Sequence, residues 1–129
     1  MERNRVGADR YHAASMPTIG ISTPVTVAGA IVIGAAEILG CLAAAYCLCP
    51  EGDLTGRMIS TVADMRTADA ASAGPENVEV IVGVKKLFED HFGGHLWAET
   101  YFSPSTNRPG LQAVYQNFYA VSCYARLLG

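Results

Sequence analysis

Charged side chains are scarce in this chain. Asp, Glu, Lys and Arg make up 16% of its 129 residues, and the net charge is −3. Lys and Arg form no basic patch and do not alternate with aromatic residues, which argues against nucleic acid as a partner. Hydrophobic residues account for 50% of the chain, a high share for a free-standing domain of this length. We therefore expect some apolar surface to contact another subunit or missing parts of the chain.

The sequence also lacks the spacings that hold a metal or carry acid–base chemistry. Cys47 and Cys49 are separated by one residue, which is not a CxxC pattern, and two glycines interrupt the helix that His91 and His95 would need to share a metal. A catalytic triad, a nucleophile elbow and paired carboxylates are absent. We predict that no metal is bound directly and that the four cysteines are buried, reduced thiols, as is usual in the cytoplasm.

A long apolar run is present instead. Residues 25–49 contain one charged side chain, Glu37, and the run is long enough to be a membrane span. A carboxylate in the middle of a span costs about 2.5–3.5 kcal/mol, and no Lys or Arg cluster flanks the run. We predict the buried helix of a cytoplasmic α/β protein, with a small membrane protein as an alternative.

Three strand–loop–helix units follow one another along the chain. The first has a strand over residues 18–21 and a helix that Ser22 or Thr23 caps, with Pro24 in its first turn. The second has a strand over residues 58–63 and a helix from Pro75 to the glycines at 93–94. The third has a strand over residues 96–102 and a helix over residues 111–128. Residues 1–17 are polar, and we expect a mobile or partner-bound leader before a domain of residues 18–129.

This alternation is typical of parallel βαβ units. The loop after the first strand lacks the glycines of a dinucleotide-binding turn, which argues against a doubly wound sheet of that kind. The alternative is part of a (β/α)8 barrel, which takes about 250 residues when complete. We predict an α/β fold of three consecutive strand–loop–helix units that resembles part of a TIM barrel.

Several short motifs occur in an order that points to one family. They are Ser22-Thr-Pro-Val-Thr-Val-Ala-Gly followed by Ala36-Glu-Ile-Leu-Gly, then Asp64-Met-Arg-Thr, Gly74-Pro-Glu and Gln112-Ala. Together they span residues 19–129, and the ordered set resembles the trimethylamine methyltransferase family. The Ser-Asp-Ala-Lys motif of the pyrrolysine members is missing near Phe102 and Ser103, so the resemblance is to the non-pyrrolysine type.

The resemblance implies a corrinoid-dependent methyltransferase on a TIM barrel. Such enzymes move a methyl group from a tertiary or quaternary amine, such as trimethylamine or a betaine, to cob(I)alamin carried by a separate corrinoid protein. Family members are several times longer than 129 residues. We therefore expect a homo-oligomer or missing barrel parts, and a non-catalytic α/β subunit or interaction module is the alternative function.

Two groups of residues are candidates for substrate binding. Asp64 and Arg66 follow the second strand, where they could contact a polar or cationic ligand or a corrinoid phosphate; alternatively, they pair locally and brace the loop. Glu99, Tyr101 and Phe102 lie on the third strand, and a carboxylate beside aromatic rings suits a quaternary ammonium, with about 0.5–2 kcal/mol from each ring face. The alternative is that the aromatic residues belong to the core and Glu99 pairs with a helix.

Hydroxyl residues precede the first helix. Ser22, Thr23 and Thr26 could bind an anion at the helix N-terminus, or one of them could serve as a simple N-cap. Glu37 is expected to be a buried, paired carboxylate, but the sequence does not name its partner.

Overall fold

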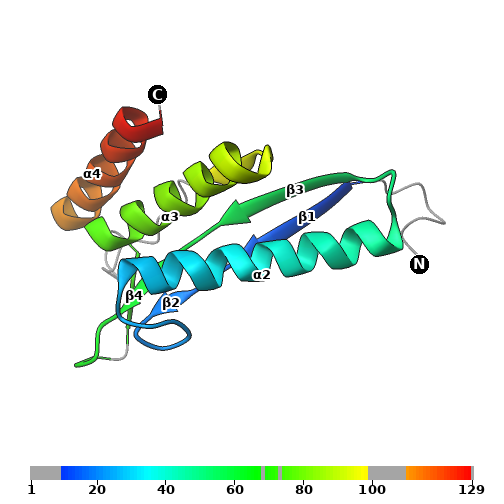
Figure 1. The fold of residues 1–129 in the computed structure, drawn as a ribbon. Coiled ribbons are helices and arrows are strands. Elements are labelled where there is room, and N and C mark those ends of the chain that lie inside the picture. The colour runs from blue at the N-terminus through cyan, green and yellow to red at the C-terminus, as the bar shows by residue number, and fades with distance from the viewer. Residues whose placement is uncertain (1–9, 68, 73, 99–109, 129) are drawn as a thin grey trace.

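The structure, a computed structural model, describes residues 10–67, 69–72, 74–98 and 110–128. Helices and strands alternate in an α/β fold (Figure 1). In chain order the elements are β1 (Arg10–Ser15), β2 (Thr18–Ile19), α2 (Val27–Leu48), β3 (Asp53–Met58), β4 (Thr61–Ala63), β5 (Ala70–Ala71), α3 (Pro75–Leu87), the π-helical turn η1 (Phe88–Phe92), β6 (Leu96–Ala98) and α4 (Leu111–Leu128).

The larger sheet contains three parallel strands in the order β1-β3-β6. A smaller sheet contains β2, β4 and β5, in which β2 and β4 are parallel and β5 runs antiparallel to β4. The parallel pairing of strands that are joined through helices confirms the prediction of an α/β fold with βαβ units.

The two sheets are continuous through a short break. Ser15 pairs with Met58 at the end of β1, and Thr18 pairs with Thr61 at the start of β2, in the same register. Between them the amide of Ile59 donates to the carbonyl of Ser15 at 3.0 Å, and the amide of Thr61 donates to the carbonyl of Pro17 at 3.2 Å. Pro17 has no amide hydrogen to offer a ladder, so the strand bends there and then resumes.

Helices α2 and α3 pack on one face of the larger sheet. Helix α2 contacts β1 and β3, and α3 contacts α2, β3 and β6. Met58 and Leu96 face these helices and are buried, whereas His12 and Trp97 on the other face are exposed. The core therefore lies between the sheet and the two helices, and the opposite sheet face is uncovered in the part of the chain that the structure describes.

Helix α2 is the one described helix that is long and apolar enough to cross a membrane, and only 22% of its apolar window is buried. The prediction of a buried helix is therefore wrong for most of α2, which is covered on one side alone. Its buried residues lie on one side and are Ala30, Gly34, Ala35 and Ile38. A Cβ atom on Gly34 would lie 2.4 Å from the methyl carbon of Met58, so the glycine lets α2 approach β3 closely.

Two features of the strands differ from the sequence prediction. Residues 10–15, expected to belong to an irregular leader, form β1, while residues 1–9 of that leader lie outside the described residues. The strand predicted over residues 58–63 is divided, because β3 covers Asp53–Met58 and ends where the prediction begins, and β4 covers Thr61–Ala63. Both errors concern the same pair of strands, because β1 and β3 pair with each other along their whole length.

The third unit agrees with the prediction where the structure describes it. Strand β6 covers Leu96–Ala98, and the remainder of the predicted strand and its loop, residues 99–109, lies outside the described residues. The preceding helix ends at Gly93, as predicted, with a φ of 62° that suits glycine. Helix α4 has the predicted bounds.

Candidate functional site

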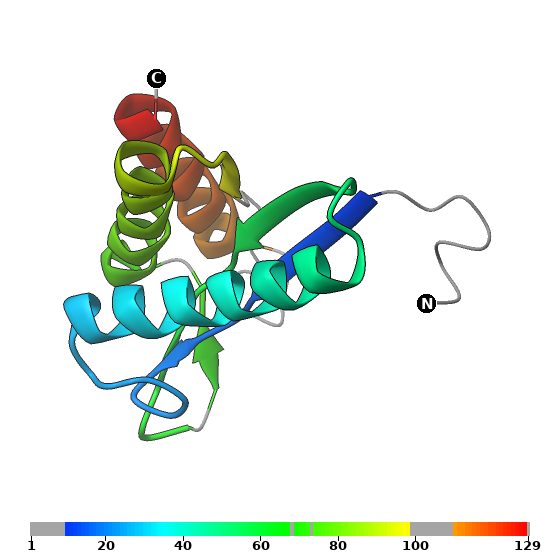
Figure 2. The same cartoon turned by 45° about the vertical axis from the view of Figure 1, so that its right-hand side comes forward.

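The carboxyl ends of β2 and β4 bring two of the candidate segments to one edge of the sheet. These strands are parallel neighbours, with Thr18 opposite Thr61 and Ile19 opposite Val62. The loop over residues 20–26 follows β2 and the turn over residues 64–67 follows β4, and both lie at the same end of the molecule (Figures 1 and 2). We call this end the carboxyl edge.

The loop after β2 is held by its own hydrogen bonds. The carbonyl of Thr18 accepts from the amides of Ile21, Ser22 and Thr23 at 3.0–3.2 Å. The hydroxyl of Ser22 accepts from the amide of Thr18 at 2.8 Å, and that of Thr23 donates to the carbonyls of Thr18 and Pro24. These amides are already engaged within the loop and form a tight turn, and anion binding by Ser22, Thr23 and Thr26 at the helix N-terminus stays a prediction.

Thr26 is the N-cap of α2. Its hydroxyl oxygen accepts from the amide of Gly29 at 3.2 Å, so the predicted cap at Ser22 or Thr23 is wrong. Pro24 lies before the helix rather than in its first turn. A Cβ atom on Gly29 would come within 2.9 Å of Pro24, so the glycine allows the proline to pack against the start of the helix.

Asp64 stabilises the turn after β4. Its carboxylate accepts from the backbone amide of Arg66 at 2.8 Å, and its own amide donates to the carbonyl of Asp69 at 2.9 Å. The hydrogen bond from Arg66 lowers the pKa of Asp64 below its ordinary value of 3.8. The local contact therefore runs to the backbone of Arg66, and both side chains are exposed at the carboxyl edge. A role in substrate binding stays a prediction for this pair.

Glu99, Tyr101 and Phe102 lie outside the described residues. Trp97, two residues before Glu99, is 62% exposed on the uncovered sheet face and stands opposite Arg57 in the strand register. Residues at opposed positions of neighbouring parallel strands point to the same side, so an indole and a guanidinium share this face.

Glu37 has a partner that the sequence could not name. The hydroxyl of Ser15 in β1 donates to its carboxylate at 2.5 Å. Ser15 is 2% exposed, while Glu37 itself is exposed, so the prediction of a buried carboxylate is wrong. The carboxylate lies at the border of the helix–sheet contact, where one oxygen satisfies a buried hydroxyl and water can reach the side chain.

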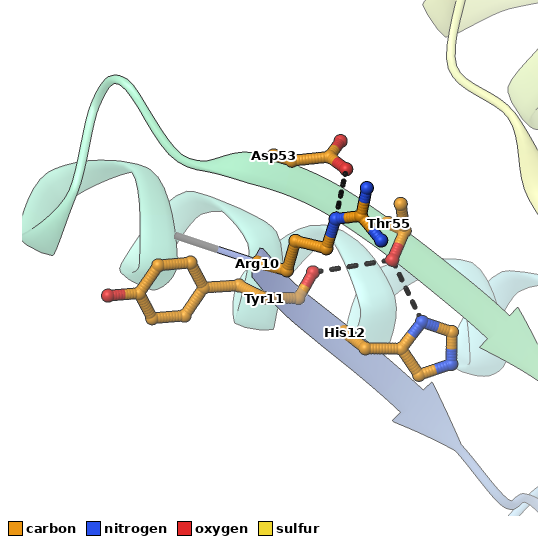
Figure 3. Close-up of polar contacts among 5 residues, drawn as sticks. All are labelled: Arg10, Tyr11, His12, Asp53 and Thr55. Carbon is orange, nitrogen blue, oxygen red and sulfur yellow. Dashed lines mark hydrogen bonds and ion pairs between the residues drawn. The ribbon is translucent and has the colours of Figure 1, made fainter. Parts of the chain in front are cut away.

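The uncovered face of β1 and β3 carries polar contacts that the sequence prediction missed (Figure 3). Arg10 lies 3.5 Å from Asp53, and the Nδ1 atom of His12 lies 2.9 Å from the hydroxyl of Thr55. That hydroxyl also lies 3.4 Å from the carbonyl of Tyr11. Residues 10–15 read Arg-Tyr-His-Ala-Ala-Ser, which offers no clear strand pattern, so no local signal in the sequence indicated these contacts. Exposed ion pairs of this kind contribute about 0–1 kcal/mol, so they add little to the stability of the sheet.

Among the residues that the structure describes, no three His, Cys, Asp or Glu side chains are grouped as ligands of a metal ion would be. The four thiols are free, and Cys41 and Cys47 are exposed, so the prediction that all of them are buried is wrong.

Comparison with protein-family models found no match, and comparison with curated proteins found none either. The family resemblance therefore rests on the sequence motifs alone.

Proposed function

We propose that this chain belongs to a corrinoid-dependent amine methyltransferase built on a (β/α)8 scaffold, and that its carboxyl edge contributes to the site for a tertiary or quaternary amine. The observation that carries the proposal is the order of the strands. Strands β1, β3 and β6 are parallel neighbours in their order along the chain, and the connecting helices α2 and α3 contact each other. Neighbouring units of a (β/α)8 barrel have this arrangement.

The position of the polar loops also supports the proposal. In (β/α)8 enzymes the active site is built from the loops at the carboxyl ends of the strands. Asp64 lies in such a loop, and because its pKa is lowered, its carboxylate is charged at neutral pH. An exposed negative charge attracts a quaternary ammonium.

The chemistry would demand little acid–base catalysis from this chain. Cob(I)alamin on a partner corrinoid protein would be the second substrate and would supply the nucleophile that takes the methyl group. The carbon–nitrogen bond breaks with its electron pair left on nitrogen, so a quaternary ammonium leaves as a neutral tertiary amine and needs no proton. A tertiary amine would react as its protonated ammonium ion and leave as a neutral secondary amine. The protein would bind the amine and orient its methyl group toward the partner.

The test is methyl transfer from trimethylamine and from glycine betaine to cob(I)alamin, followed by the visible absorption of the cobalamin. We expect transfer by the wild-type chain and at least about a tenfold loss in kcat/KM for Asp64→Asn, the loss of one charge contact. Asp69→Asn is the matched control, since Asp69 is an exposed aspartate in the same connection between β4 and β5, and we assign its side chain no role. A folded chain that transfers no methyl group and binds neither amine would overturn the proposal.

A non-catalytic α/β subunit is the second candidate. Strands β1 and β6 are the edges of the described larger sheet, and the face opposite α2 and α3 is uncovered there. Open edges and an open face are surfaces on which further strands can add. Absence of amine binding by a folded chain, together with stable capture of a partner subunit, would favour this function.

A further inference from the structure

Helix α4 presents its large apolar side chains to solvent. We define its outer face by the five most outward of them, Leu111, Val114, Tyr115, Phe118 and Val121, which are 76%, 63%, 70%, 73% and 52% exposed. Their spacing of three and four residues places them on one side of the helix. Within α4 the one charged residue is Arg126, so this outer face is apolar and uncharged over most of its length.

The inner face of the same helix is already occupied. Ala120 is fully buried and Tyr124 is 3% exposed, and α4 contacts α3 on this side. Both views show α4 beside α3 at the outside of the molecule (Figures 1 and 2). A surface helix ordinarily turns its large apolar residues toward the core. In α4 Ala120 and Tyr124 face inward, whereas five other large apolar residues face outward, so packing within the described chain leaves the outer face without a partner.

We propose that the outer face of α4 is a self-association surface and that its occupant is the same face of a second copy of this chain. The exposed apolar area of the outer face is about 500–600 Å² per copy, judged from the size of these side chains and their exposure. Two copies that cover this area fully would bury about 1,000–1,200 Å², which is the lower limit for a specific interface. A single apolar stripe is self-complementary under two-fold symmetry, because each residue can meet the equivalent stripe of its partner.

The absence of charge on the outer face favours a second copy of this chain over a charged partner or a lipid surface. A partner chosen by charge would need complementary charged residues, and the outer face has none. A helix that lies on a lipid surface pairs its apolar face with a polar face rich in Lys and Arg, whereas the opposite side of α4 is packed against α3. The inference goes beyond the proposed methyl transfer and does not depend on it.

The test is the molar mass of the full chain by light scattering over a concentration series. We expect about twice the chain mass of 13.7 kDa for the wild type at micromolar concentrations and above. Val114→Glu is expected to be monomeric, because it places a charge in the interface. Val32→Glu is the matched control: Val32 lies on α2 and is 63% exposed, the same fraction as Val114. The control is expected to keep the mass of the wild type.

A second variant keeps the test decisive if Val114→Glu fails to fold. Phe118→Ala removes an aromatic ring from the centre of the outer face, and we expect its dimer dissociation constant to rise at least about tenfold. Far-ultraviolet circular dichroism checks that each variant is folded. A monomeric wild-type chain would overturn the inference, as would a dimer that Val114→Glu and Phe118→Ala leave intact. Equal dissociation by Val32→Glu would also overturn it, because the effect would not belong to α4. Methyl-transfer activity plays no part in this readout.

Discussion

At the scale of single residues, two carboxylates of this apolar chain, those of Glu37 and Asp64, are positioned by hydrogen bonds. Ser15 and Glu37 satisfy each other at the border between β1 and α2, so the one carboxylate of the long apolar helix remains in contact with water. Asp64 uses one carboxylate oxygen to hold the turn after β4. In both cases a hydrogen bond to a neighbouring group, rather than an ion pair, positions the charge.

The turn at Asp64 is expected to depend on pH. The ionised carboxylate accepts from the amide of Arg66, and its pKa is lowered. A lowered pKa means that this contribution to stability is fully present above the ordinary value of 3.8 and is lost as pH falls through the pKa of the folded state. We expect Asp64→Ala to be less stable than the wild type at neutral pH, and the two to converge in acid.

Urea unfolding at several pH values measures that difference, and carboxyl NMR titration of Asp64 measures the pKa itself. Asp69→Asn serves as the control and should leave the titration of Asp64 lowered. An Asp64 carboxyl that titrates at or above 3.8 would contradict the assigned hydrogen bond.

At the scale of an element, the sequence of helix α2 is compatible both with a membrane and with packing on a sheet. Its length and composition satisfy the requirement for a membrane span, yet it packs against β1, β3 and α3. The small residues Gly34 and Ala35 lie in this contact and permit close approach to the sheet. The packed side and the free side therefore ought to respond differently to substitution.

We expect Ile38→Ala to lower the free energy of unfolding by about 2–5 kcal/mol, because Ile38 is 1% exposed and its removal leaves a cavity against the sheet. Val32→Ala, on the free side of the same helix, should change it by no more than about 0.5 kcal/mol. Urea unfolding of both variants without detergent is the measurement. Equal effects at the two positions would argue that α2 does not lie on the sheet as described.

At the scale of the whole molecule, the contact of one side of α2 with the sheet leads to a prediction about solubility. We expect the purified chain to remain in the supernatant after high-speed centrifugation without detergent, because the side of α2 that carries Ala30, Gly34 and Ile38 is covered by β1, β3 and α3. A chain lacking Val25 to Leu48 is not a useful control, since it would lose the core. Recovery only in detergent, or stable partition into lipid vesicles, would favour the membrane protein that the sequence left as an alternative.

Much of the fold could be predicted because its signals are local. The apolar run of α2, the proline at the start of α3 and the glycine that ends the following turn are each contained within a few residues. The candidate site was harder to predict from the sequence. Ser22, Thr23 and Thr26 are equivalent as caps by residue type, and Thr26 takes the role because the turn over residues 18–23 engages the other two.

The sequence by itself determined the helices, their α/β class and the polar loops that follow the strands, because periodicity and turn residues act over short distances. Only the tertiary structure decided that residues 10–15 form a strand, since β1 exists by pairing with β3 more than forty residues away. It also decided that Ser15 is the partner of Glu37 and which side of α4 faces outward. These outcomes depend on contacts between distant segments, which no local pattern of residues encodes.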